Sequence, residues 1–372
     1  MSSEVSDPQA KAGRREAAIT KLDAFWLRLP LLTSYENALG PISDFDVILI
    51  RVEDEEGGVG WGEACPVKGY SPESPGEAWE LSATILPTFK GMGPQAIEHE
   101  LQRWHSRYPF LVSGIVESLE DLSDEPLLRS SEPVELELAG TVNTLNETEA
   151  AAYASRLVDQ GYRSLKVKVG YDPMGDARRV NTILAAVGDQ ARLRVDANQG
   201  YGADAALVFA GAVDAAGVEM FEQPVSGHDW DAMGHVAAHS VIPVMLDEAI
   251  YGDVEIVRAS KLSGVAAVKL KLSKSGGARE LYRQFRLATE CGLQVVVGNG
   301  VASDLGCLHE ALACSHAHMP LAGEMNGFIK TEVRLLDPSP TISGAHLIIQ
   351  PSSGQCVNGN FDNWIYKMIN VA

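Results

Sequence analysis

Apolar residues along the chain follow two different periods. From about residue 134 onward, short β-branched runs alternate with stretches whose apolar residues recur at a helical period of about 3.6. Such alternation predicts parallel β-α-β units, and eight of them close into a (β/α)8 barrel of the TIM type, an α/β fold. A doubly wound open sheet is the structural rival, but it would need a glycine-rich dinucleotide fingerprint after an early strand, which the sequence lacks.

Each expected strand of this region ends in a polar cluster. The expected strands are Val134–Thr141, Ser164–Val169, Leu193–Asp196, Glu219–Phe221, Val244–Leu246, Ala267–Lys271, Leu293–Val297 and, more weakly marked, Leu321–Glu324. The expected helices are Glu147–Gln160, Pro173–Val187, Ala203–Ala216, Asp229–His239, Val254–Ser260, Gly277–Cys291 and Ser303–His316.

The first third of the chain has a different pattern. Alternating β-branched residues predict strands over Ile19–Leu32 and Asp46–Val52, and Gly57-Gly58 marks a hairpin turn. Helical periods then continue to about Leu128, so this region predicts a separate α+β domain. We therefore expect a disordered tail over 1–18, an α+β domain over 19–132, the barrel over 133–335 and a C-terminal segment over 336–372.

The net charge and the cysteine content indicate which kinds of binding partner and which compartment to expect. The 372 residues include 30 Lys and Arg against 50 Asp and Glu, a net charge of −20 that repels nucleic acid and anionic membranes alike. No apolar stretch is long enough to span a bilayer, and the polar start lacks the apolar region of a signal peptide. Five scattered cysteines without a C-x-x-C pair are typical of reduced thiols, so we expect a cytoplasmic protein that binds a small molecule.

The polar clusters that close the expected strands carry the candidate chemistry, because barrel enzymes build their sites at the C-terminal ends of strands. Two lysines close the second strand and two close the sixth, and residues two apart share one face of a strand. Carboxylates close the three strands between them. In chain order these charges are Lys166, Lys168, Asp196, Glu222, Asp247, Lys269 and Lys271.

Three carboxylates on adjacent strands, Asp196, Glu222 and Asp247, offer only oxygen ligands and so predict Mg²⁺, with Mn²⁺ as the alternative. Lysines flanking such a site can remove the weakly acidic proton beside a substrate carboxylate, while the cation stabilises the enediolate. Repulsion from a second lysine, together with the nearby Mg²⁺, is expected to lower the pKa of the base towards the working pH. A single charge at a strand end is more often a helix cap or a surface ion pair, but five successive clusters favour a site.

Six motifs together resemble the enolase superfamily: SLKVKVG, RVDANQGY, FEQPV, MLDEA, VKLKLSKSGG and VVVGNGVASDLG. Their order and spacing resemble its muconate-lactonizing subgroup, in the mandelate racemase/muconate lactonizing enzyme family, which also contains dipeptide epimerases, N-acylamino acid racemases and o-succinylbenzoate synthases. The resemblance extends from about Ile19 onward. It implies an enolase-like modified barrel, an N-terminal domain that caps the site, a C-terminal segment that returns to this domain, and a homo-oligomer.

The resemblance also implies roles for single residues. Lys168 is the expected base on one face of the substrate, and Lys271 is the expected acid/base on the other. Lys166 is expected to act as an electrostatic helper beside the substrate carboxylate. The three carboxylates match the Mg²⁺ ligands, and Asn198 matches an asparagine that the subgroup keeps beside the site. Lys274 is expected to belong only to the loop that opens the sixth helix.

Two loops of the capping domain, near Leu31–Ala38 and Pro66–Pro72, are expected to close over the substrate. Tyr35 and Tyr70 lie on these loops as lid residues or as ordinary exposed aromatics.

The end of the eighth strand departs from the family patterns. The chain has Glu324-Met325-Asn326-Gly327 where muconate cycloisomerases resemble E-x-F-G and dipeptide epimerases resemble D-x-D-G. Glu324 fits the first pattern, whereas Asn326 fits neither. As substrate-binding candidates, these residues could hold the ammonium group of an amino-acid-like substrate, or Glu324 could serve the structure alone.

These residues predict a Mg²⁺-dependent isomerase that takes the α-proton from a small carboxylate substrate and returns it through an enediolate intermediate. Racemisation or epimerisation of an amino-acid or dipeptide derivative needs both lysines, and a muconate-type cycloisomerisation can use the same intermediate. A dehydratase or β-eliminating lyase of the same superfamily, acting on a hydroxy acid or hydroxyproline or as an o-succinylbenzoate synthase, is the alternative. A Schiff-base aldolase and a non-catalytic barrel are the rivals outside the superfamily.

Overall fold

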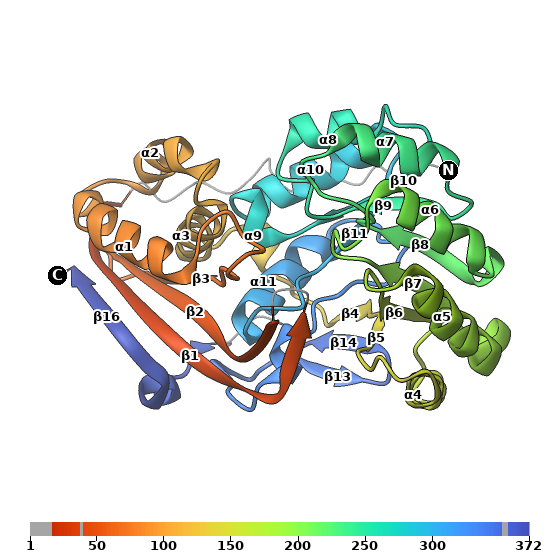
Figure 1. The fold of residues 1–372 in the computed structure, drawn as a ribbon. Coiled ribbons are helices and arrows are strands. Elements are labelled where there is room, and N and C mark those ends of the chain that lie inside the picture. Colours follow the sequence, from red (N-terminus) through yellow and green to blue (C-terminus); the bar gives the residue numbers. More distant parts are fainter. Residues whose placement is uncertain (1–16, 38–39, 352–355, 372) are drawn as a thin grey trace, which may run out of the picture.

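The computed structural model describes residues 17–37, 40–351 and 356–371 and contains a curled parallel sheet beside an antiparallel one (Figure 1). The parallel sheet has seven strands in the order β11-β10-β9-β8-β7-β6-β5. Runs such as Val244–Leu246 form its strands because both of their faces are buried. The strands are β5 (Gly140–Val142), β6 (Ser164–Lys168), β7 (Arg192–Asp196), β8 (Val218–Glu222), β9 (Val244–Leu246), β10 (Val265–Leu270) and β11 (Gln294–Val297).

Helices connect these strands and cover the outside of the parallel sheet (Figure 1). Four of them start at a polar cap, because Asn146, Asp172, Asp229 and Ser303 each accept a hydrogen bond from a first-turn N–H. The connecting helices are α4 (Glu147–Asp159), α5 (Pro173–Val187), α6 (Ala203–Ala212), α7 (Trp230–His239), α8 (Asp253–Ala259), the short α9 (Leu272–Ser275), α10 (Ala278–Glu290) and α11 (Asp304–Ser315).

The eighth expected strand is not formed as a strand. The segment around Gly323 makes only an isolated parallel bridge, yet it closes the ring on both sides. Gly323 donates to the Glu137 carbonyl at 2.8 Å, and Glu324 donates to the Val297 carbonyl at 3.0 Å. A Cβ at Gly298, whose φ is +143°, would meet the Glu324 backbone at 2.5 Å, so this approach requires glycine. The barrel prediction is confirmed, with irregular backbone in place of the last strand.

The first expected strand divides into two. β4 (Val134–Glu137) pairs with β14 (His346–Ile349), which also pairs with β13 (Thr341–Ser343), whereas β5 alone joins β6. β12 (Leu336–Asp337) and β15 (Cys356–Val357) form a further antiparallel pair. The local alternation cannot show this division, because the partner of β4 comes from far along the chain.

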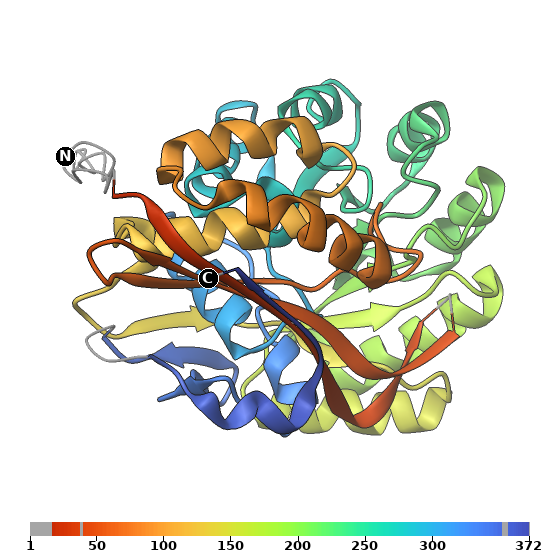
Figure 2. The same ribbon diagram turned by 90° about the vertical axis from the view of Figure 1, so that its left-hand side faces the viewer.

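The antiparallel sheet has the order β16-β1-β2-β3 and pairs the first described strand with the last one. It consists of β1 (Ile19–Asn37), β2 (Gly40–Asp54), β3 (Val59–Ala64) and β16 (Ile365–Val371). The helices α1 (Pro75–Ile85), α2 (Pro94–His105) and α3 (Pro109–Leu122) lie over it, and we call this sheet and its three helices the cap (Figure 2). A Cβ at Gly62 would meet the Gly114 carbonyl at 2.1 Å, so α3 packs directly on β3.

The predicted tail over 1–18 falls almost wholly outside the described residues, and the predicted domain boundaries stay a prediction. Within the described part of the chain, no helix combines the length and apolarity that crossing a membrane requires.

Buried glutamates of the cap bind backbone N–H groups of the barrel. Glu63 of β3 accepts hydrogen bonds from the Ser303 backbone N–H, at 2.9 Å, and from the Ser303 hydroxyl. Glu120 of α3 accepts from the N–H groups of Ala278 and Arg279, at 2.6 and 3.1 Å, where α10 begins. Burial raises the pKa of the Glu63 carboxyl to about 7, although the hydrogen bonds from Ser303 oppose this rise.

The Glu63→Gln variant should lose part of the pH dependence of stability. Folded protein keeps the Glu63 proton up to about pH 7, whereas the unfolded chain loses it near pKa 4.5. The free energy of unfolding therefore falls as pH rises between these values, by up to about 3 kcal/mol for this group. Urea unfolding at about pH 5 and about pH 8 measures the effect. The control is exposed Glu56→Gln in the preceding turn, and an unchanged pH dependence in Glu63→Gln would contradict the prediction.

Candidate active site

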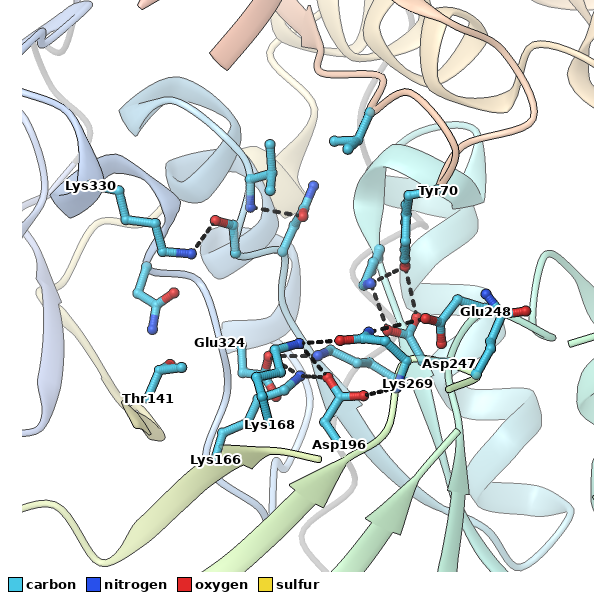
Figure 3. A pocket seen from close by; sticks show the side chains of 18 of the residues that line it. Tyr70, Thr141, Lys166, Lys168, Asp196, Asp247, Glu248, Lys269, Glu324 and Lys330 are labelled. Carbon is cyan, nitrogen blue, oxygen red and sulfur yellow. Dashed lines mark hydrogen bonds and ion pairs between the residues drawn. The ribbon is translucent and has the colours of Figure 1, made fainter. Parts of the chain in front are cut away.

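A pocket opens at the C-terminal ends of the barrel strands and beneath the cap, where the sequence predicts the site (Figure 3). It has an empty volume of about 1010 Å³. The cap contributes Val67, Tyr70 and Phe110, and the strand ends contribute the charged side chains. Both parts of the molecule therefore build the site.

Buried ammonium groups and carboxylates form the floor of the pocket. Lys166 Nζ lies 2.8 Å from Asp196 Oδ2, 3.0 Å from Glu222 Oε1 and 2.9 Å from Glu324 Oε2. Lys269 Nζ lies 3.1 Å from the same oxygen of Glu222 and 2.5 Å from the same oxygen of Glu324. Because all five side chains are buried, each charge depends on its partners for stability.

Glu324 is held by cations of the chain itself. Besides the two lysines at its Oε2, Arg194 Nη1 lies 3.1 Å from its Oε1. Arg194 is fully buried and also contacts Glu219 at 3.0 Å. Both oxygens of Glu324 are thus engaged, and these contacts favour the structural role over the binding of a substrate ammonium.

The first catalytic candidate, Lys168, stands at the end of β6. Its Nζ donates to Asp196 Oδ2 and to Asn198 Oδ1, both at 2.6 Å. Asn198 has a φ of +41°, which asparagine tolerates better than most residues, and its amide donates to Glu248 Oε1 at 3.1 Å. Asn198 therefore fixes Lys168 on one side and Glu248 on the other.

The second catalytic candidate, Lys271, follows β10. Its Nζ lies 2.7 Å from Asp247 Oδ2 and contacts the Tyr70 hydroxyl, which in turn donates to Asp247 Oδ1 at 3.1 Å. Tyr70 thus reaches from the cap into the site (Figure 3), as a lid residue would. Lys274, expected only in a loop, is buried in α9 and donates to the Asp247 carbonyl at 2.9 Å.

Comparison with protein families identifies the chain. A model described as enolase C-terminal domain-like matches residues 149–358, more than half of the sequence. The chain belongs to the enolase superfamily. The prediction of this superfamily is confirmed, and the match covers most of the barrel on which the two lysines and the carboxylates lie.

Curated relatives of this superfamily member are isomerases by name. An N-succinyl-L-Arg/Lys racemase from Bacillus cereus is 28% identical over 312 residues, which cover 77% of this chain and 82% of that protein. Muconate cycloisomerase 1 from Pseudomonas putida is 29% identical over 291 residues, covering 74% and 76%. A crystal structure of N-succinyl Arg/Lys racemase from Bacillus cereus has a TM-score of 0.87 at 23% identity, covering 95% of this chain and 100% of that one. The fold is therefore shared along almost the whole chain.

The two lysines beside Asp247 in this superfamily site have pKa values shifted in opposite directions. Burial lowers the pKa of Lys271, but the carboxylates of Asp247 and Glu248 outweigh burial and the repulsion from Lys166, so the pKa is raised. The expected lowering of the pKa includes the charge of a bound cation, and it stays a prediction. It is Lys274 whose pKa is lowered, to about 8, chiefly by burial.

Carboxylate oxygens are available on the pocket floor for a divalent cation. Asp196 and Glu222 are register partners at the ends of β7 and β8, and Lys166 bridges them. Among the described residues, Glu222 Oε2 and Glu248 Oε2 are buried atoms without a hydrogen-bond partner. In that part of the chain, no group of three His, Cys, Asp or Glu side chains is already arranged to hold a metal ion. Lysine ammonium groups contact the other oxygens of Asp196 and Glu222. The donor atoms of these residues are carboxylate oxygens, which are the ligands that a hard divalent cation prefers.

Most substrate-site candidates meet in this pocket. Asn198 and Asn326 line it beside the lysines, while Glu222 lies in the floor network. Tyr35 pairs through its backbone with Ile42 in the β1–β2 register, so its predicted loop is a strand there, and its side chain lies outside the described part.

Some residues of the site are not among those predicted from the polar clusters at the strand ends. Arg194 has a signal in the sequence, because it lies two positions before Asp196 and so shares its inward face. Glu248 directly follows a predicted ligand. Lys330 lies in an irregular segment, where no period in the sequence indicates which way a side chain points.

The Arg194→Met variant should be less stable by about 3 kcal/mol, because it leaves buried Glu324 with fewer compensating charges. Thermal or urea unfolding measures the loss. Arg192→Met, an exposed position on the same strand, is the matched control and should stay within about 0.5 kcal/mol. Equal stability of the two variants would show that the ion network does not stabilise the barrel.

Proposed function

We propose that this enzyme racemises or epimerises a small carboxylate substrate by removing and returning the proton beside the carboxylate. The observation that carries the proposal is the pair Lys168 and Lys271, which line one pocket from different strand ends. Each ammonium group is held by a different carboxylate, Asp196 or Asp247 (Figure 3). With one lysine at each face of the substrate, one can take the proton and the other can return it.

The chain's own groups prepare the two lysines for opposite roles. Lys271 is protonated because its carboxylate neighbours raise its pKa, so it is ready to donate a proton. Lys168 is aimed by its two hydrogen bonds at 2.6 Å, and it must lose its proton before it can accept the one from the substrate. Lys166 adds positive charge to the floor, which attracts the substrate carboxylate.

The names of the relatives support this reaction class. They include a racemase for N-succinylated amino acids and an L-Ala-D/L-Glu epimerase from Bacillus subtilis, which is 27% identical over 303 residues. Cycloisomerisation is the second candidate, because muconate cycloisomerase 1 is 29% identical and Glu324 fits the E-x-F-G pattern.

A divalent cation, Mg²⁺ or Mn²⁺, is part of the proposal, with Asp196, Glu222 and Asp247 as the residues that would hold it. When bound, it supplies charge that stabilises the enediolate and opposes the effect of the carboxylates on the lysines. A structural relative, dipeptide epimerase from Cytophaga hutchinsonii, is a complex with Mg and a dipeptide, which supports the choice of magnesium. The buried Glu222 Oε2, which has no hydrogen-bond partner in the part of the chain that the structure describes, also supports it.

We also propose a cytoplasmic homo-oligomer. Cys65, Cys291, Cys307 and Cys314 are free thiols, which suits a reducing compartment. The superfamily resemblance supports self-association.

Lys168→Ala and Lys271→Ala should each lower racemisation about 10²-fold to 10⁴-fold, because each removes a general acid or base. One variant should still exchange the α-proton of one substrate enantiomer with solvent deuterium, and the other variant should do so with the opposite enantiomer. Proton NMR in D₂O, on a panel of N-acylamino acids and dipeptides, measures both. Full turnover in both variants would refute the assignment, and product formation by elimination would favour the lyase alternative.

Asp196→Asn should weaken Mg²⁺ binding at least about tenfold, since it removes a ligand charge from the proposed site. Titration calorimetry with MgCl₂ measures this without any substrate. Asp204→Asn, an exposed aspartate at the start of α6, is the control and should bind Mg²⁺ like the unmodified protein. Equal binding by both variants would place the cation elsewhere.

A further inference from the structure

One buried carboxyl group of the barrel has no part in the reaction as described so far. Glu310 lies within α11 and is only 2% exposed. Its Oε1 accepts a hydrogen bond from the Leu272 N–H at 2.9 Å, and its Oε2 accepts one from the Asn299 N–H at 2.9 Å. These two donors belong to the segments that follow β10 and β11. Glu310 therefore joins the ends of two neighbouring strands through their backbone.

The backbone of Lys271 lies beyond the parallel ladder, whereas that of Lys168 lies within it. The pairing of β10 with β11 ends at Leu270 and Val297. Lys168 is still a residue of β6 and pairs with Asp196 of β7. Since ladder hydrogen bonds fix a strand relative to its neighbours, the sheet holds Lys168 in place but leaves Lys271 to contacts of another kind.

Glu310 supplies such a contact at the peptide group that Lys271 shares with Leu272. A peptide group is planar, so a hydrogen bond to its N–H also restrains the Cα atom of the preceding residue. The carbonyl oxygen of the same peptide group accepts from the Lys274 N–H and from the Ser275 hydroxyl, both at 3.0 Å. Both of these donors lie on α9, the short helix that Lys271 itself begins, whereas Glu310 lies on the longer α11. Glu310 thus ties this peptide group to a separate element of the barrel.

The second oxygen of Glu310 restrains the neighbouring strand end. Asn299 lines the pocket, and its side-chain amide donates to the Ser273 hydroxyl at 3.4 Å, a longer contact between the same two segments. One carboxyl group therefore keeps the segment with Lys271 and the segment with Asn299 in a fixed relation. A loss of this carboxyl group would leave two buried N–H groups without their acceptor.

We propose that Glu310 is a positioning residue that holds Lys271, but not Lys168, at its face of the substrate. The inference rests on the proposed function, in which each lysine transfers a proton at a different face. Both hydrogen bonds of Glu310 go to segments after β10 and β11, while β9, β8 and β7 lie between β10 and the strand of Lys168. Loss of Glu310 should therefore impair proton transfer at one face, whereas a merely structural role would impair both alike.

The test follows α-proton exchange in D₂O by proton NMR. The probes are the two configurations at the α-carbon of the panel compound, an N-acylamino acid or a dipeptide, that the unmodified enzyme exchanges fastest. The configuration that Lys168→Ala still exchanges is the one whose proton Lys271 removes. For this configuration, Glu310→Gln should lower kcat about tenfold to 10²-fold with KM within about threefold, because a small displacement of a catalytic group is costly. Exchange of the other configuration should stay within about threefold.

The choice of variants grades the effect. Glu310→Gln keeps the length of the side chain but replaces one acceptor oxygen by an amide donor, so it can accept from only one of the two N–H groups. Glu310→Met accepts from neither, and its loss of exchange at the Lys271 face should be larger.

Asp304→Asn is the matched control on the same helix. Asp304 is fully buried and accepts from two backbone N–H groups, those of Leu335 and Leu336, at 2.9 and 3.0 Å. Like Glu310→Gln, this variant should unfold at a lower temperature than the unmodified enzyme. It should nevertheless keep the unmodified ratio between the two exchange rates, because its partners lie away from Lys271.

Amide hydrogen exchange tests the contact without a substrate and, in the unmodified enzyme, without any variant. The Leu272 and Asn299 amides should be protected, and mass spectrometry should show faster exchange of both segments in Glu310→Gln. Exchange of these two amides in the unmodified enzyme at the rate of an unfolded peptide would overturn the inference even if every Glu310 variant failed to fold.

Failure of the inference and failure of the proposed function give different results. An equal loss of exchange at both configurations in Glu310→Gln, or no loss at either, would overturn the inference alone, provided that Lys168→Ala and Lys271→Ala each abolish exchange of one configuration. Full turnover in both lysine variants would overturn the proposed function and, with it, the catalytic role of Glu310.

Discussion

The ammonium group of Lys166, enclosed by three carboxylates, is the interaction on which the rest of the site depends. It joins the ends of β6, β7 and β8 to the segment that closes the barrel, through Asp196, Glu222 and Glu324. A buried charge that lacks its partner is strongly destabilising, so the strand ends must lie in register for the charges to compensate one another. That register in turn fixes where Lys168 projects, because it lies two residues beyond Lys166 on the same face.

The cap is held on the barrel by contacts of its own, one of which reaches the second catalytic candidate. Tyr70 contacts both Lys271 and Asp247, while Glu63 and Glu120 bind backbone groups of the barrel. A displacement of the cap would therefore remove a partner from a catalytic candidate and leave buried carboxyl groups without donors. The site is complete only when both parts of the molecule are docked.

Local patterns in the sequence predict those features that depend on local geometry. The two-residue spacing within Lys166–Lys168 and the succession of strand-end carboxylates follow from the pleat and from parallel topology, so both could be predicted. Glu324 could be located at the barrel mouth, but its engagement by Arg194 depends on an approach between distant segments. The closing segment and Lys330 lie on irregular backbone, which has no period to indicate direction. Local patterns could show that the cap sheet is β structure, whereas the return of the C-terminal segment to this sheet followed only from the family resemblance, because β1 and β16 are separated by nearly the whole chain.

The pairing of β1 with β16 has a consequence for biosynthesis. Leu22 to Leu27 are hydrogen bonded to a strand that spans Ile365–Val371, so β1 is synthesised before the barrel and its edge partner after the barrel. Until then β1 is an open sheet edge that could template contacts between nascent chains. The barrel is synthesised entirely within this interval, so the cap sheet can be completed only after the whole barrel has been made.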